Sequence, residues 1–180
     1  MPTSGTCYYK YDDEWQLQYE ENLTIEEKHK IIDILTTHHN GLWPESPYGD
    51  VIEDRNSQIS ISFLGQLAPA KEKYEWFKLH QQDRVQLQVK LALLLPEFEV
   101  KMGGSTTIDV TRKGIDKAYG INKLMSILNV KKEDILFIGD KLEEGGNDYP
   151  VKLMGVDTIS VDCWQDTIKI LNQLLVDHNI

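Results

Sequence analysis

The chain has 180 residues, 41% hydrophobic and 27% charged, which is enough material for one or two folded domains with a real core. Its net charge of −10 argues against nucleic acid or an anionic membrane as a main partner, because both attract basic surfaces. No apolar run approaches the ~20 residues of a membrane span, and residues 1–20 lack the apolar core of a signal peptide. The two cysteines stand far apart in the sequence. We therefore expect a cytoplasmic protein with reduced thiols.

The N-terminal part of the chain predicts a hairpin followed by a helix. Residues 6–21 hold two short segments rich in Tyr and Trp around an acidic turn, which is typical of a β-hairpin. Residues 23–39 carry apolar side chains at helical spacing from Ile25 onward. Thr24 and Glu27 have the spacing of a capping box, so the helix is expected to begin there.

The middle of the chain predicts two more hairpins and helical structure between them. After a loop rich in Gly and Pro at 40–50, the alternating apolar residues of 51–65 indicate a second hairpin with one buried face. Pro69 opens a helix. Residues 84–96 fit a strand by alternation and a helix by a Val85, Val89, Ala92 and Leu95 stripe, and their Gln, Lys, Leu and Ala content favours the helix. Residues 98–111 indicate a third hairpin.

After Gly114 the pattern changes to an alternation of helices and apolar strands. The expected order is helix 115–128, strand 134–139, a loop, a helix from about 147, strand 158–162 and helix 164–176. Such an alternation predicts a parallel sheet of the α/β class. The chain is therefore expected to divide near residue 112 into an α+β part and a partial doubly wound part.

The turn after the strand at 134–139 carries two acids that could bind a metal ion. Asp140 stands where the strand ends, and Asp148 follows eight residues later, after two glycines and Asn147. In open α/β sheets, ligands bind beyond the carboxyl ends of the strands, and Mg²⁺ needs only one or two carboxylates. Asn147 could cap the next helix, whose first turn tolerates Pro150. A solvated acidic turn would account for the same residues.

Lys117, at the start of the preceding helix, could act beside these acids. A cation next to carboxylates and a phosphoryl group neutralises the charge that develops in phosphoryl transfer. Taken alone, a Lys on a helix is more often simply solvated.

Together, these stretches resemble motifs III and IV of the haloacid dehalogenase (HAD) superfamily. The similarity is greatest to the subfamily with an α/β cap, which includes eukaryotic phosphomannomutases and bacterial phosphomannomutase-like hydrolases. The matching stretches are "EDRNSQISISFLGQ", "GGSTTIDVTRKGIDKAYGI" and "FIGDKLEEGGNDYP". The resemblance implies residues 1–22 as an N-terminal hairpin of the core, 23–112 as an α/β cap that sets substrate specificity, and 113–180 as a partial Rossmann-like core.

The resemblance also implies site residues. Lys117 would be the motif III lysine, and Asp140 the motif IV ligand of Mg²⁺, with Asn147 and Asp148 supporting the metal and Lys117. In the cap, the residues that would contact the substrate and its phosphate are Arg55, Gln66, Lys73, Thr107 and Asp109. Gln66 and Lys73 stand where the family has arginines, and Thr107 where it has serine. Because Gln cannot replace a charged Arg fork, these departures weigh against mannose phosphate and mutase action in particular.

The family's nucleophile is not found in this sequence. HAD enzymes carry motif I, Asp-x-Asp-x-[Thr/Val], whose first Asp attacks phosphorus, and no two aspartates here have that spacing. The sequence is therefore expected to correspond to the part of the family after motifs I and II, and to be inactive alone. In the resembling fold the motif I strand lies beside the strand at 135–138, so we expect an open apolar edge there. Pairing with a second copy in a homodimer, or with the chain's own hairpin at 6–20, would cover it.

We thus expect a phosphomannomutase-like phosphohydrolase or phosphotransferase that acts on a small phosphate ester such as a hexose phosphate. Two alternatives remain: a non-catalytic remnant that binds a phosphate ligand or regulates, and a split enzyme that needs a partner chain.

Overall fold

The computed structural model describes residues 1–178 and divides the chain into two compact units, Met1–Ile115 and Asp116–Ile180. The N-terminal hairpin falls in the first unit. The assignment of residues 1–22 to the catalytic core stays a prediction, as do the domain boundaries that came with it.

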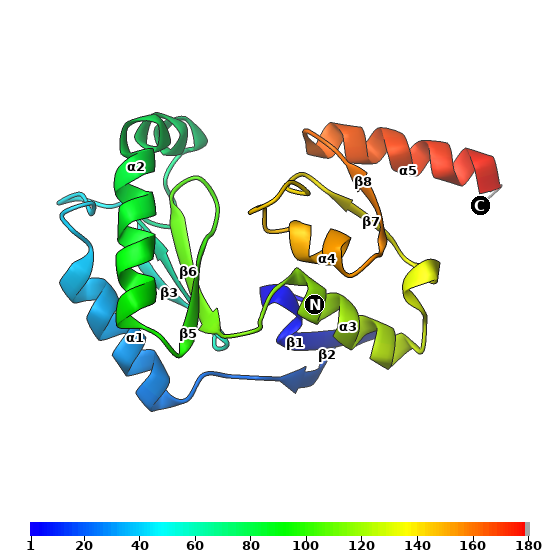
Figure 1. Cartoon of the computed structure of the whole chain (residues 1–180), viewed down its shortest axis with the longest axis horizontal. Coiled ribbons are helices and arrows are strands. Elements are labelled where there is room, and N and C mark those ends of the chain that lie inside the picture. The colour runs from blue at the N-terminus through cyan, green and yellow to red at the C-terminus, as the bar shows by residue number, and fades with distance from the viewer. Residues whose placement is uncertain (179–180) are drawn as a thin grey trace. The chain divides into compact units, whose positions relative to one another are not determined.

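The first unit contains the three expected hairpins and two helices (Figure 1). Its elements are the 3-10 turn Thr3–Gly5, β1 (Cys7–Asp12), β2 (Glu14–Glu20), α1 (Ile25–His38), β3 (Ile52–Asp54), β4 (Gln58–Ser62), α2 (Ala70–Leu94), β5 (Phe98–Met102) and β6 (Thr107–Arg112). β1 and β2 pair only with each other, whereas the other four strands form one antiparallel sheet in the order β3-β4-β6-β5.

Alternation along β4 and β6 gives this four-stranded sheet one apolar and one polar face. Ile59 pairs with Val110 and Ile61 with Ile108, and all four side chains are fully buried. α1 and α2 lie side by side over this face (Figure 1) and complete the core with residues such as Ile31, Leu35, Leu87 and Leu91. Fully burying one such aliphatic side chain contributes roughly 1.5–3 kcal/mol.

The opposite face of the sheet is polar, although much of it is buried. Ser60 lies between Glu53 on β3 and Asp109 on β6, and Asp109 pairs in turn with Lys101 on β5. Ser60 is 1% exposed. A row of hydroxyl, carboxylate and ammonium groups therefore crosses the sheet, and it is the feature of this unit that can recognise a polar ligand.

α1 begins as predicted, but its buried stripe differs from the expected one. Thr24 accepts a hydrogen bond from the Glu27 N–H, and the Glu27 carboxylate accepts one from the Thr24 N–H, which is the expected capping box. The buried positions are Ile31 and Leu35, whereas Ile25 is 68% exposed. Ile25 is the first residue of the helix and lies beyond the edge of the sheet's core.

The segment 84–96 is helical, as its composition favoured, and forms the second part of α2. The helix runs from Ala70 to Leu94 and changes direction at His80, whose backbone is not helical. The buried side is formed by Arg84, Leu87, Leu91 and Leu95. Of the predicted stripe, Leu95 is buried and Ala92 packs against the core, but Val85 and Val89 were wrong, because both are about half exposed. The packed face follows the position of β5 and the core, which periodicity in the sequence does not reveal.

The second unit has the expected α/β alternation. Its elements are α3 (Lys117–Leu128), a 3-10 turn (Lys132–Asp134), β7 (Leu136–Gly139), α4 (Tyr149–Leu153), β8 (Asp157–Ser160) and α5 (Trp164–His178). β7 and β8 pair in parallel, with Leu136 opposite Asp157 and Gly139 opposite Ser160. The carboxyl ends of the two strands therefore meet at one edge, where the Asp140–Asp148 turn leaves β7.

This second unit leaves much apolar surface uncovered. Within residues 1–178, β7 hydrogen-bonds to β8 alone. Leu136 on β7 is 43% exposed. Along α5, the exposed apolar side chains recur at helical spacing at Trp164, Ile168, Leu171 and Leu175.

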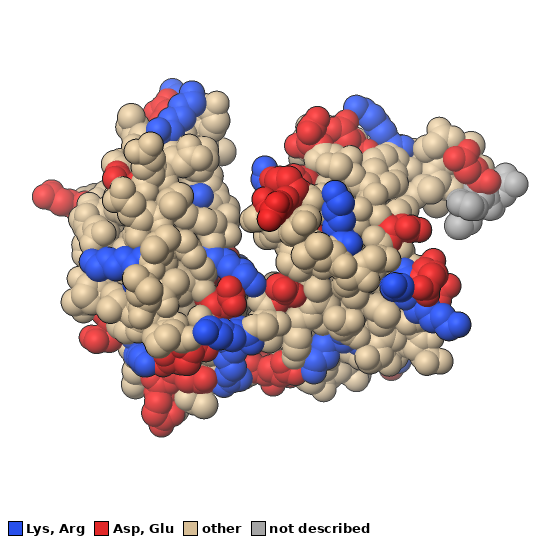
Figure 2. All heavy atoms as spheres, in the orientation of Figure 1, with Lys and Arg blue, Asp and Glu red and all other residues tan. Residues whose placement is uncertain are grey.

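The surface view shows acidic and basic side chains interspersed on the visible face of each unit, not gathered into a single basic patch (Figure 2). Among the described residues, no helix combines the length and the hydropathy needed to cross a membrane.

Candidate functional site

Lys117 is placed by the local structure at the start of α3. Asp116 is the N-cap of this helix, and its carboxylate accepts a hydrogen bond from the Tyr119 N–H at 2.9 Å. This cap satisfies one of the free N–H groups of the first turn. Lys117 is the first helical residue, and its side chain extends toward the turn that follows β7.

Asp148 is held against the end of β7 by the turn itself. Its N–H donates to the Lys141 carbonyl at 3.1 Å, and its Oδ2 accepts from the Lys141 N–H at 3.1 Å. A side chain at Gly139 would come within 2.6 Å of the Asp148 carboxylate, and one at Gly146 within 2.2 Å of the Lys141 carbonyl oxygen. The two glycines therefore allow the turn to close, and closure buries the carboxylate.

Lys117 and Asp148 form the ion pair of this site. Lys117 Nζ donates to Asp148 Oδ1, and it lies 3.4 Å from Asn147 Oδ1. The Asp148 side chain is 1% exposed, whereas that of Lys117 is 38% exposed. A buried carboxylate thus holds the ammonium group of a partly exposed side chain, which is suited to binding an anion at the carboxyl end of a parallel strand.

The expected role of Asn147 as a helix cap was wrong. Asp148 holds the N-cap position of α4, and its side chain makes no capping hydrogen bond because it points to Lys117 and Lys141. Asn147 instead contributes its amide oxygen to the surroundings of Lys117. Pro150 lies in the first turn of α4, as predicted.

The described residues do not form a complete metal site. Among residues 1–178, no group of three His, Cys, Asp or Glu side chains lies close enough together to hold a metal ion. The candidate carboxylates are those of the exposed Asp140, next to Gly139 at the end of β7, and of Asp148, each of whose oxygens accepts one hydrogen bond. One carboxylate with an amide oxygen and waters is a minimal set for Mg²⁺.

In the first unit, Arg55 and Asp109 lie near each other on the polar face of the sheet. Arg55 Nε and Nη2 both donate to Glu53 Oε2, at 2.8 and 2.6 Å. Asp109 accepts a hydrogen bond from the Ser60 hydroxyl at 2.7 Å. Burial raises the pKa of Asp109, while the Ser60 hydrogen bond and the Arg55 charge act in the opposite direction. Glu53 raises the pKa of Arg55, which stays a cation.

Thr107 completes this group at the start of β6. A side chain added at Gly103 would lie 2.2 Å from the Thr107 hydroxyl and 2.7 Å from Asp109 Oδ2. The β5–β6 turn therefore passes directly over these two side chains, and only glycine fits there. Arg84, which is 6% exposed, holds the same turn by donating from Nη1 to the Gly104 carbonyl at 2.6 Å.

Gln66 and Lys73 form a separate pair. Lys73 Nζ lies 3.4 Å from the Gln66 carbonyl, and the Gln66 Nε2 group is buried without a hydrogen-bond partner. Gln66 follows the C-terminal end of β4, whereas Arg55 precedes its N-terminal end. At about 3.3 Å per residue, the two backbone positions are separated by the length of the strand. The convergence of Arg55, Lys73 and Thr107 on one phosphate stays a prediction.

Two residues of the polar face were missed in the sequence. Ser60 contacts Asp109, its register partner on the neighbouring strand, and Glu53 contacts Arg55, which follows two residues later in the chain. The alternation of β4 would have placed Ser60 on the face opposite Ile59 and Ile61, but the pairing of β4 with β6 was needed to place it beside Asp109.

Comparison with known proteins identifies the family. A family model described as eukaryotic phosphomannomutase matches residues 2–177. The chain belongs to this family. It is 29% identical over 196 aligned positions to a phosphomannomutase of Encephalitozoon cuniculi, covering 97% of this chain and 70% of that protein. It is 32% identical over 135 positions to a phosphomannomutase of Saccharomyces cerevisiae, covering 70% of this chain and 50% of that protein.

The fold is also that of known HAD-type structures. An IMP-bound IMP-nucleotidase of Plasmodium falciparum matches with a TM-score of 0.58 at 18% identity, over 96% of this chain and 46% of that one. A HAD/COF-like hydrolase of Plasmodium vivax matches with a TM-score of 0.50 at 15% identity, over 87% of this chain and 65% of that one. The likeness in fold extends over the helices, the antiparallel sheet and the parallel strands of this chain. The chain spans about half the length of several of its matched relatives.

Proposed function

We propose that this chain binds the phosphate ester of a sugar and belongs to the machinery of phosphoryl transfer or hydrolysis. The observation that carries the proposal is the Lys117–Asp148 pair at the carboxyl end of β7, in a chain of the phosphomannomutase family. A buried carboxylate that holds a partly exposed ammonium group is the arrangement expected of a cation that meets a phosphoryl group.

In this proposal, Lys117 neutralises negative charge on the phosphoryl group, and Asp148 orients Lys117. Asn147 limits the movement of the Lys117 ammonium group, because its amide oxygen accepts a hydrogen bond from that group. The pair requires no proton transfer, since both groups act through charge and hydrogen bonding. Removing Asp148 would leave Lys117 free to turn toward solvent, because its side chain is 38% exposed.

The polar face of the cap sheet is proposed to recognise the sugar and its phosphate. Arg55 supplies a fork of N–H donors for phosphate, and Asp109 and Thr107 offer an acceptor and a hydroxyl for sugar hydroxyl groups. The unpartnered Gln66 Nε2 and the Lys73 ammonium are donors for a second polar group of the ligand. With only Arg55 and Lys73 as cations among these residues, we propose a ligand with one phosphate group.

Mg²⁺ is the metal that the family resemblance implies, and it would meet Asp140 and Asn147 here. When bound, it would polarise phosphate oxygens. Asp148 is the third proposed ligand, and because the motif I carboxylate of the family site is not found in this sequence, we expect weak binding. No step of the proposed chemistry is assigned to the metal.

Turnover is not expected from this chain alone. None of its 15 aspartates is two positions from another, so the Asp-x-Asp nucleophile motif does not occur in the 180 residues. We propose that binding is retained and the covalent step is not. If the chain is part of a split enzyme, a partner chain that supplies the nucleophile would restore turnover. If the chain is a phosphate-binding remnant, adding such a partner would not produce turnover.

The proposal is tested by calorimetry and turnover on the same preparation. Mannose 6-phosphate and glucose 6-phosphate are titrated into the purified chain, into Arg55→Gln and into Lys10→Gln, a control that removes an equal charge from an exposed position in β1. Binding that weakens roughly tenfold or more in Arg55→Gln only, with no Mg²⁺-dependent release of phosphate, supports the proposal. Equal binding by all three proteins, or phosphate release that Asp140→Ala abolishes, contradicts it.

A further inference from the structure

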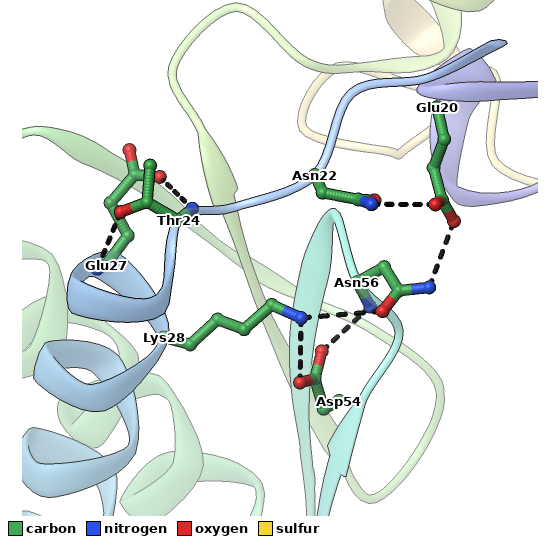
Figure 3. Close-up of polar contacts among 7 residues, drawn as sticks. All are labelled: Glu20, Asn22, Thr24, Glu27, Lys28, Asp54 and Asn56. Carbon is green, nitrogen blue, oxygen red and sulfur yellow. Dashed lines mark hydrogen bonds and ion pairs between the residues drawn. The ribbon is translucent and has the colours of Figure 1, made fainter.

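The turn that carries Arg55 is tied to other segments of the chain through the side chains of Asp54, Asn56 and Ser57. This turn, Asp54–Ser57, joins β3 to β4. Figure 3 shows its polar contacts with α1 and with the segment between β2 and α1. The Asp54 carboxylate accepts from Lys28 Nζ at 2.9 Å and from the Asn56 N–H at 2.8 Å.

Asn56 has the most connections in this turn. Its Nδ2 donates to Glu20 Oε1 at 3.0 Å, and its Oδ1 lies 3.4 Å from Lys28 Nζ (Figure 3). Its carbonyl accepts a hydrogen bond from the Leu23 N–H at 3.0 Å. Glu20 is itself held by Asn22, whose Nδ2 donates to Glu20 Oε2 at 2.7 Å. Asn56 therefore ties the turn to residues 20–23.

Ser57 fixes the other side of the turn. Its hydroxyl shares a buried hydrogen bond of 2.6 Å with the Thr6 hydroxyl. The chain at Thr6 is joined to the same linker, because the Glu21 N–H donates to the Thr6 carbonyl at 2.8 Å. The turn therefore hydrogen-bonds to three segments: the start of the β1–β2 hairpin at Thr6, the linker at residues 20–23, and α1 at Lys28. The Arg55 guanidinium contacts Glu53.

We propose that Asn56 is a positioning residue that couples the 20–23 linker to the presentation of Arg55. The proposal rests on the proposed role of Arg55 in binding phosphate. Asn56 acts in two ways: its backbone adopts a left-handed conformation with φ 63°, and its side chain bonds the linker. Asn tolerates this φ better than most residues, and glycine tolerates it without strain.

These two roles can be separated by substitution. Asn56→Gly keeps the backbone conformation and removes the bonds to Glu20 and Lys28. Glu20→Ala removes the bond from its other end and leaves Asn56 in place. Asn40→Gly is the matched control, since Asn40 is also left-handed at φ 56° and also loses a bond to a lysine, Lys90 at 2.9 Å.

The experiment measures binding of mannose 6-phosphate by calorimetry, and amide hydrogen exchange, in the wild type, the three single variants and the Asn56→Gly/Glu20→Ala double variant. Losing the Asn56–Glu20 hydrogen bond, at about 1 kcal/mol, should weaken binding roughly fivefold in both Asn56→Gly and Glu20→Ala. The double variant should bind no more weakly than Asn56→Gly, because both substitutions remove this same bond. Exchange at the Leu23, Arg55 and Ser57 amides should become faster, and Asn40→Gly should change neither quantity.

Wild-type affinity in Asn56→Gly and Glu20→Ala would overturn the coupling, as would additive losses in the double variant. If the wild-type chain binds no hexose phosphate, the proposed function fails, and the exchange data still decide the coupling. Faster exchange at Arg55 and Ser57 on changing Glu20 supports it, and unchanged exchange there refutes it.

Discussion

Replacing Asp148 with asparagine should destabilise the second unit far more than its small chemical change suggests. The substitution removes the charge that holds Lys117 and places an amide N–H₂ where two donors, Lys117 Nζ and the Lys141 N–H, now point. The side chain is 1% exposed, so water cannot replace the lost partners.

The size of the effect follows from the contacts. Hydrogen bonds to charged groups are worth about 1.5–3 kcal/mol, and the exposure of Lys117 favours the lower part of this range, so we expect about 2 kcal/mol. For a unit of this length, ~2 kcal/mol corresponds to a fall in Tm of roughly 8–16 °C. The change should appear in amide exchange along β7 and α4 and leave the cap unaffected.

Asp166→Asn provides the control. Asp166 also accepts a bond from a lysine of the same unit, Lys169 at 2.8 Å, but the Lys169 side chain is 76% exposed. Such a surface pair contributes far less to stability than a buried one, because water solvates both charges. If Asp148→Asn lowers the free energy of unfolding by no more than Asp166→Asn does, the buried pair is not what holds the β7–α4 turn.

Three further predictions concern the cap and the open sheet. Arg112 lowers the pKa of Glu27, so the stability that this pair contributes is present above the unfolded pKa and is lost as the pH falls through the folded pKa. In urea unfolding, Glu27→Gln should therefore reduce the free energy of unfolding by ~1 kcal/mol at pH 7 and by little near pH 3. Burial raises the pKa of Asp109, so the stability that this residue contributes is present below the unfolded pKa and is lost as the pH rises through the folded pKa. Asp109→Asn should therefore raise the Tm at pH 7, and the gain should disappear toward pH 3. An unchanged or lower Tm at pH 7 would contradict this prediction. The unpaired edge of β7 and the exposed Leu136 should pair with a second copy, so sedimentation should show a dimer that Leu136→Lys converts to monomer, and a stable wild-type monomer would refute this pairing.

The local signals in the sequence predicted the elements well. The capping box at Thr24 and Glu27 set the start of α1, and the alternation of Ile59 and Ile61 gave the buried face of β4. These features depend on residues within a few positions of one another, so pattern alone was sufficient. The packed face of α2 depends on which strand lies beneath it, and Val85 and Val89 were therefore assigned to the wrong side.

The site shows the same division. The Lys117–Asp148 pair joins residues 31 positions apart, and the resemblance to motifs III and IV, not the spacing, brought them together. Asn147 was predicted to cap α4 because its residue type suits a cap, but the turn places Asp148 there and directs its side chain elsewhere. The roles of Ser60 and Asn56 depend on strand register and on the fold of residues 20–28, which no local pattern encodes.

The central claim, that the polar face of the cap sheet binds a sugar phosphate, is tested most directly by NMR. Mannose 6-phosphate is titrated into the ¹⁵N-labelled chain, and amide shifts are followed for every residue. We predict saturable shifts at the β3–β4 turn around Arg55, in β6 from Thr107 to Asp109 and in the Gln66 loop, all lost in Arg55→Gln. Shifts spread over the outer surfaces of α1 and α2, or no saturable shift at all, would contradict the claim.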